Sequence, residues 1–203
     1  MIHRIAAAIT SWLITMGVVE SNDRELFEYA AYCLIFGSLP IIIVVVWGIV
    51  FRLYLESLVL IIPFMLIRKF SGGYHLASAK VCFVTSVAIL GVSLLMTKLI
   101  YAYGRSEMLS GAVLLSVLCI CKFSPIDSDA RKLTPKETIL FQKIARIISV
   151  VMMVVYFTGR WTGRIHFSVP FGIGIVIPAL LQLPAIAIRL FQKHKSASQI
   201  RQT

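Results

Sequence analysis

Charged residues are scarce in this chain, and acidic residues are the scarcest. Of 203 residues only nine are Asp or Glu, and all charged types together make up 14%. Hydrophobic types make up 59%, a balance that excludes an ordinary soluble domain. We therefore expect an all-α integral membrane protein, because backbone polar groups in lipid must be satisfied within their own segment. The apolar runs are too long, and alternate too poorly, for a β-barrel.

Cysteine is also sparse, and its spacing excludes a disulfide framework. The cysteines are Cys33, Cys82, Cys119 and Cys121. Cys119 and Cys121 resemble half of a metal site, but no His or second Cys pair lies near them in sequence, so we interpret them as buried apolar thiols. We expect no metal and no other cofactor.

The excess of basic residues follows the predicted membrane topology. A net charge of +11 would suggest nucleic acid in a soluble domain, but here no aromatic-interleaved basic patch exists, so we expect no nucleic-acid partner. With six spans and both ends on one side, that side receives Arg4, Arg24, Arg68, Lys69, Lys80, Lys122, Arg131, Lys132, Lys136, Lys143, Arg146, Arg189, Lys193, Lys195 and Arg201. The other side keeps Arg52, Lys98, Arg105, Arg160 and Arg164. This bias predicts cytoplasmic termini in a multi-pass cell-membrane protein.

Hydrophobic periodicity divides the chain into one membrane domain over 1–203. Residues 1–25 hold an apolar stripe typical of an amphipathic interfacial helix, with a cleaved signal peptide as the alternative. Residues 26–191 form the expected six-span bundle, and 192–203 a basic, disordered cytoplasmic tail. The spans are expected at about 29–50, at a second run ending at 67, and at about 79–102, 109–123, 144–157 and 167–190. Glycines and prolines in the last span predict close packing or breaks.

One polar stretch, RKFSGGYHLASAKVC at residues 68–82, interrupts the hydrocarbon and holds the candidate chemistry. Gly72 and Gly73 predict a broken Gly-Gly turn before the third span. His75 and Cys82 then lie at a membrane edge, where an imidazole favours the nucleophilic thiolate. On an unbroken helix their Cα atoms would be about 10.5 Å apart, so the helix must begin between them, with Ser78 as a candidate N-cap.

Each of the other polar residues has more than one interpretation. Arg68 either snorkels into headgroups or holds a carboxylate through its planar guanidinium. Tyr74 either orients a reacting group or is an interfacial aromatic. Asp127 and Asp129, in the loop over 124–143, either orient His75, pair with Arg68, or are ordinary solvated charges.

Two further titratable residues are expected to lie outside the candidate chemistry. Glu56 follows Arg52 by one helical turn, which predicts a local ion pair. His166 is expected to be an exposed loop residue.

The pattern of Arg68, Gly72, Gly73, Tyr74, His75 and Cys82 resembles the accessory gene regulator B (AgrB) peptidases of Gram-positive quorum sensing. The stretch Ser124-Pro125-Ile126-Asp127-Ser128-Asp129 resembles that family's proline-and-acid loop, although Ala130-Arg131-Lys132-Leu133 departs from its usual continuation. The resemblance implies a membrane cysteine endopeptidase that removes the C-terminal tail of a propeptide and lets it cyclise through a thioester. It also implies a homodimer, a cytoplasmic active site, and a small propeptide with an amphipathic leader and an acidic tail.

The main alternative is a small transporter or channel for a peptide or an ion. It predicts ionisable residues near the bilayer midplane, whereas this chain places most charges at span ends. A rhomboid-like serine peptidase is excluded because no span holds a Gly-x-Ser-x-Gly nucleophile turn. A purely structural membrane protein would tolerate Cys82→Ser in every assay.

Overall fold

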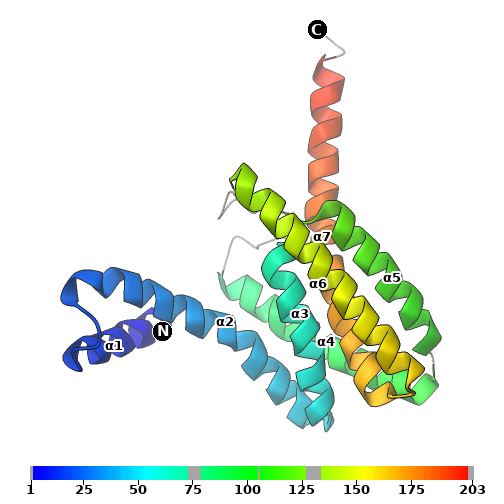
Figure 1. The fold of residues 1–203 in the computed structure, drawn as a ribbon, viewed down its shortest axis with the longest axis horizontal. Helices are drawn as coiled ribbons and strands as arrows, with labels where there is room; N and C mark the ends of the chain where they lie inside the picture. The colour runs from blue at the N-terminus through cyan, green and yellow to red at the C-terminus, as the bar shows by residue number, and fades with distance from the viewer. Residues whose placement is uncertain (1, 73–78, 105, 127–133, 201–203) are drawn as a thin grey trace. The chain divides into compact units, whose positions relative to one another are not determined.

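The chain is helical wherever its structure is described. The structure is a computed structural model that describes residues 2–72, 79–104, 106–126 and 134–200 (Figure 1). Its elements are α1 Ile2–Thr15, the 3₁₀ helix η1 Ser21–Asp23, α2 Arg24–Phe51, α3 Tyr54–Ser71, α4 Ala79–Tyr103, α5 Ser106–Phe123, α6 Pro135–Trp161 and α7 Ile165–Ile200. The all-α prediction is confirmed for these residues.

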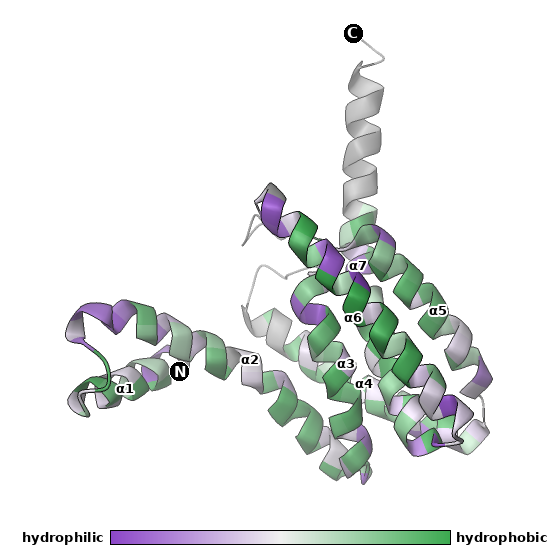
Figure 2. Cartoon of the chain, viewed as in Figure 1, coloured by the Kyte–Doolittle hydropathy of each residue, from purple (hydrophilic) through white to green (hydrophobic). Residues whose placement is uncertain are grey.

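Helices occupy all six predicted span positions, but not all of them qualify as spans. Within the described ranges, five helices are long and apolar enough to cross a membrane: α2, α4, α5, α6 and α7. The remaining helix, α3, carries Glu56, Arg68 and Lys69. Hydrophobic residues run along the helices (Figure 2), and many large apolar side chains are exposed, as expected for helices in contact with lipid. The membrane character is therefore confirmed, and the count of six spans stays a prediction.

The chain divides into two compact units, 1–43 and 44–203, and α2 runs through the boundary. In the first unit, α1 folds back along the start of α2. The His3 ring stacks on the Tyr32 ring with centroids 4.4 Å apart, and Arg24 donates to the hydroxyl of Ser11. Ala6 and Thr10 are fully buried. The opposite face of α1 exposes an apolar stripe formed by Ile5, Ile9, Trp12 and Met16.

In the second unit, α7 is the central helix. Its span over 165–187 is 67% buried, whereas no other candidate span exceeds 28%. It packs against α3, α4, α5 and α6. Gly174 explains the close approach to α3, because a Cβ there would collide with the carbonyl of Leu60. Gly172 likewise lies against the ring of Tyr156 on α6. The predicted close packing of the last span is confirmed at both glycines.

The helix α4 is fastened to the end of α2. The indole Nε1 of Trp47 donates to the carbonyl of Val87 over 3.0 Å. Gly91 lies directly under the same indole ring, where a Cβ would be only 2.8 Å from it. This contact fixes the helix whose first turn contains Cys82.

Two expectations about element bounds were wrong. The loop predicted over 124–143 is shorter, because α6 already begins at Pro135. There the hydroxyl of Thr134 accepts from the backbone N–H of Glu137, whose carboxylate in turn accepts from the Thr134 N–H. This capping box satisfies two otherwise unpaired amides. In the tail predicted to be disordered, residues 192–200 are helical instead and form the end of α7, which continues without interruption to Ile200.

Candidate active site

The helix α3 ends in a backbone conformation that favours glycine. Gly72 has φ 68° and ψ −154°, a region open almost only to glycine. The guanidinium of Arg68 donates to the Gly72 carbonyl over 2.8 Å, which satisfies an acceptor at the helix end. Thus α3 ends at Ser71 and the next helix begins at Ala79. Gly73 lies outside the described residues, so the Gly-Gly turn itself stays a prediction.

The described part of the second motif segment, residues 124–126, lies directly against the end of α3. The backbone N–H of Ile126 donates to the Ser71 carbonyl over 3.1 Å, and Gly72 and Ile126 form a parallel β-bridge. A Cβ on Gly72 would collide with the Ile126 carbonyl. Glycine is therefore needed here for close approach as well as for its φ. The structure thus brings together the two segments that the sequence analysis singled out.

A buried glutamine that the sequence analysis did not identify joins these segments. Gln182, on α7, is fully buried. Its Nε2 donates to the Ser71 carbonyl over 3.2 Å and to the hydroxyl of Ser124 over 2.9 Å. A primary amide within an apolar span was the available signal, because a buried polar group needs partners.

Apolar contacts also hold the segment that contains Ile126. Ile126 is 4% exposed and packs with Ala185 and Ile186 of α7, and Cys119 of α5 packs against this group. Ala185 and Ile186 lie about one helical turn beyond Gln182. One face of α7 therefore contacts residues 124–126 through both hydrogen bonds and apolar packing. Cys119 has the packing role expected of an apolar thiol.

The predicted catalytic residues are only partly covered by the structure. Because α4 begins at Ala79, the backbone of Cys82 lies in its first turn, at the place predicted for it. Outside the described residues lie Gly73, Tyr74, His75, Ser78, Asp127 and Asp129, so their roles stay predictions. Among the described residues, no group of three His, Cys, Asp or Glu side chains is arranged to hold a metal.

The opposite end of the bundle corrects two predictions. Glu56 does not pair with Arg52 but with His166 of α7, whose Nδ1 lies 3.0 Å from Glu56 Oε1. The carboxylate side chain is 14% exposed and the imidazole 81%. The ring of Tyr101 lies against the same imidazole, with centroids 4.9 Å apart. His166 is exposed as predicted, but it belongs to a helix and links it to α3.

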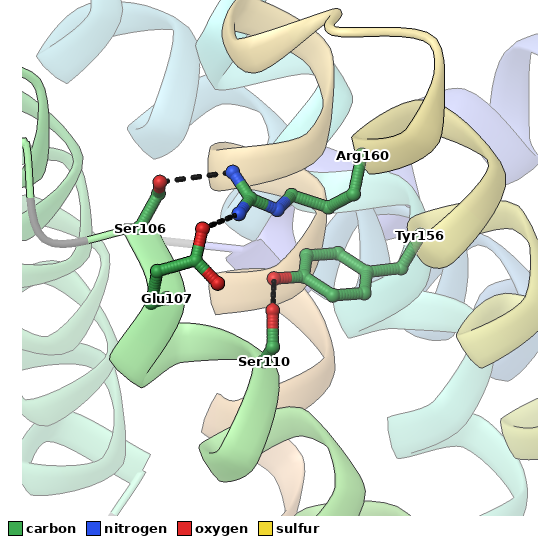
Figure 3. Close-up of polar contacts among 5 residues, drawn as sticks. All are labelled: Ser106, Glu107, Ser110, Tyr156 and Arg160. Carbon is green, nitrogen blue, oxygen red and sulfur yellow. Dashed lines mark hydrogen bonds and ion pairs between the residues drawn. The ribbon is translucent and has the colours of Figure 1, made fainter.

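The same end also joins α5 to α6. Arg160 forms an ion pair with Glu107 and donates to the hydroxyl of Ser106, while the hydroxyls of Ser110 and Tyr156 lie 3.0 Å apart (Figure 3). One of the few basic residues assigned to this side is thereby neutralised by an acid. These contacts fix the distal end of the bundle, away from the Gly72 and Ile126 pair.

Comparison with known proteins assigns the fold to a family. The family model for accessory gene regulator B matches residues 3–184. The chain belongs to this AgrB family. AgrB-like protein 2 of Clostridium perfringens strain 13 is 25% identical over 188 residues, covering 85% of this chain and 88% of the relative. An AgrB-like protein of C. perfringens strain SM101 is 23% identical over 175 residues, covering 80% and 82%. No solved structure matches the chain.

Membership of the AgrB family confirms the resemblance carried by the two motifs. It places the chain among membrane proteins involved in processing quorum-sensing peptides. Both Clostridium relatives are described only as AgrB-like.

Proposed function

We propose that this chain is a membrane cysteine endopeptidase that removes the C-terminal tail of a quorum-sensing propeptide and promotes its cyclisation. The observation that supports this most is the direct pairing of Gly72 with Ile126. Gly72 lies within the first of the two motifs that resemble the AgrB family, and Ile126 lies within the second. This pairing supports the proposal because the chain continues from Gly72 toward His75 and Cys82, and from Ile126 toward Asp127 and Asp129.

In the proposed reaction, His75 takes the proton of the Cys82 thiol. The thiolate attacks a propeptide carbonyl, an S–C bond forms, and the peptide C–N bond breaks. The leaving amine takes the proton from His75, and the acidic tail departs. The acyl-enzyme thioester is then attacked by an internal thiol or hydroxyl of the propeptide, which closes a thiolactone or lactone and returns Cys82 as the leaving group. Because a thioester conserves acyl activation, a thiolactone needs no further source of energy.

Residues around this pair have supporting roles in the proposal. Helix N–H groups in the first turn of α4 favour the thiolate and an oxyanion beside it. Ser78 caps that turn, Gly73 extends the bend, and Tyr74 orients the substrate or the imidazole. Asp127 or Asp129 orients His75.

Arg68 has two roles in the proposal, one at the end of α3 and one toward carboxylates. Its Nη1 already holds the Gly72 carbonyl. The planar, always charged guanidinium is of a kind that suits carboxylates, such as the acidic tail of a propeptide or a loop acid.

The proposed substrate has an amphipathic leader as well as an acidic tail. The exposed apolar stripe of α1, with Ile5, Ile9 and Trp12, suits a helix lying in the membrane interface, where such a leader would also bind. We place the termini and the reaction on the cytoplasmic side, following the positive-inside bias. The working form is proposed to be a homodimer, as the family resemblance implies.

Transport of ions is less well supported than peptidase activity. The buried polar residues of the described bundle are serines, threonines and Gln182, and none is charged. Coupled transporters place ionisable groups near the bilayer midplane. The charged residues Glu56 and Arg68 lie instead at the first and last turns of α3.

The test co-expresses the chain with a short reading frame, beside its gene, that encodes an internal Cys or Ser and an acidic end. Mass spectrometry then follows the released tail. We expect release with the wild type and none with Cys82→Ala or His75→Ala, while membrane insertion is unchanged. The control Cys33→Ala alters an exposed cysteine of α2 and should retain release. Tail release by the Cys82→Ala variant would refute the proposal.

A further inference from the structure

The side chain of Gln182 lies between the two motif segments and donates a hydrogen bond to each. Its Nε2 carries two hydrogens, and both are used: one on the Ser71 carbonyl and one on the hydroxyl of Ser124. Ser71 is fully buried and Ser124 is 2% exposed. The amide therefore links the end of α3 to Ser124, at the start of the second motif segment, and all three residues are buried.

Chemistry fixes the orientation of this amide. The Ser71 carbonyl can only accept, so the atom of Gln182 that faces it must be the donor nitrogen. The same carbonyl also accepts from the Ile126 N–H, so both of its lone pairs are used. Among the described residues, the buried Oε1 of Gln182 has no hydrogen-bond partner. The fold retains an unsatisfied acceptor here, which is costly in a buried site.

From these contacts we propose that Gln182 is a positioning residue for the peptidase reaction. It sets the distance between the segment that leads to His75 and Cys82 and the segment that leads to the loop acids. It acts through Ser71 and Ser124. This inference rests on the proposed function, and it adds a residue from the last span to a site otherwise built from two motifs near α3 and α5.

The first measurement is the alkylation rate of Cys82 by iodoacetamide in the full-length protein, resolved by mass spectrometry of its peptide. Gln182→Met keeps the length of the side chain and removes both donors. We expect it to slow Cys82 alkylation about tenfold, because the imidazole no longer holds the thiolate. Gln142→Met, at a partly buried position of α6, is the matched control and should leave the rate unchanged. Cys33, an exposed cysteine of α2, is alkylated in the same samples and reports general accessibility.

The second measurement separates positioning from folding. With a synthetic propeptide, Gln182→Met should lower kcat about 100-fold and change KM less than about twofold. Gln182→Glu can donate to the Ser71 carbonyl only when protonated, and burial favours that form. Its kcat relative to the wild type should therefore rise from about pH 8 to about pH 5. The same ratio for Gln182→Met should not change with pH.

The outcomes distinguish this inference from the proposed function. Wild-type alkylation of Cys82 that is no faster than that of the exposed Cys33 would overturn both. Fast alkylation in the wild type and in Gln182→Met alike would overturn the positioning role alone. A pH-independent ratio for Gln182→Glu, or equal losses in Gln142→Met and Gln182→Met, would also overturn it.

Discussion

Glu56 Oε1 and His166 Nδ1 lie 3.0 Å apart and join the first turn of α3 to the first turn of α7. These two helices form the central packing of the second unit. The pair is asymmetric, because the carboxylate side chain is 14% exposed and the imidazole 81%. Removing the exposed partner therefore leaves the buried one without its hydrogen bond.

We predict that His166→Ala destabilises the protein more than Glu56→Gln. His166→Ala leaves a largely buried carboxylate without its hydrogen-bond partner and should lower the free energy of unfolding by about 1–3 kcal/mol. Glu56→Gln retains a hydrogen-bonding group and should cost about 1 kcal/mol or less. Thermal unfolding in detergent measures both, with Arg164→Ala as an exposed neighbouring control. The reverse order would contradict the pairing.

Gly72 offers a test of the contact between the motif segments. Gly72→Ala should lower the free energy of unfolding by more than about 2 kcal/mol, because the backbone conformation and the collision with the Ile126 carbonyl act together. It should also abolish tail release. Unfolding midpoints and tail release by mass spectrometry are the two measurements.

Two other glycines separate the causes of this effect. Gly163 has φ 69° with open space around its Cβ direction, so Gly163→Ala should cost only about 1 kcal/mol from strain. Gly111 lies in open space within α5, so Gly111→Ala should stabilise by about 0.5–1 kcal/mol. Equal effects at positions 72 and 163 would argue against close contact with Ile126.

The capping box at the start of α6 gives a third prediction. Thr134→Ala removes the acceptor of the Glu137 N–H and should cost about 1 kcal/mol in the free energy of unfolding. Thr162→Ala, at the other end of α6, removes a hydroxyl that bonds to carbonyls of its own helix and is the control. Hydrogen exchange of the first turn of α6 should quicken in the first variant only. Unchanged exchange there would show that the box does not hold the helix start.

Local signals in the sequence predicted much of this fold. Apolar runs located helices at every expected span position, and Gly72 marked the end of α3. The glycines at 172 and 174 predicted close packing, which follows because a helix without a Cβ can approach its neighbour. These features depend on residues close together in sequence.

The predictions that failed depended on partners far away in sequence. Glu56 was assigned to Arg52 because the two lie one helical turn apart, yet its partner comes from α7. Gln182 went unrecognised because its hydrogen-bond partners lie on α3 and on the loop after α5.

One wrong prediction had a local cause. The capping box at Thr134 was not recognised in the sequence, so the predicted loop was too long.

The most direct test of the central claim is the mass of the intact protein, rapidly quenched in acid after mixing with propeptide. We predict an added mass equal to the propeptide without its tail, attached at Cys82 and removed by hydroxylamine, as a thioester requires. Cys82→Ala should acquire no such mass. Tail release by the wild type with no adduct at any time point, or an adduct that persists in Cys82→Ala, would contradict the account.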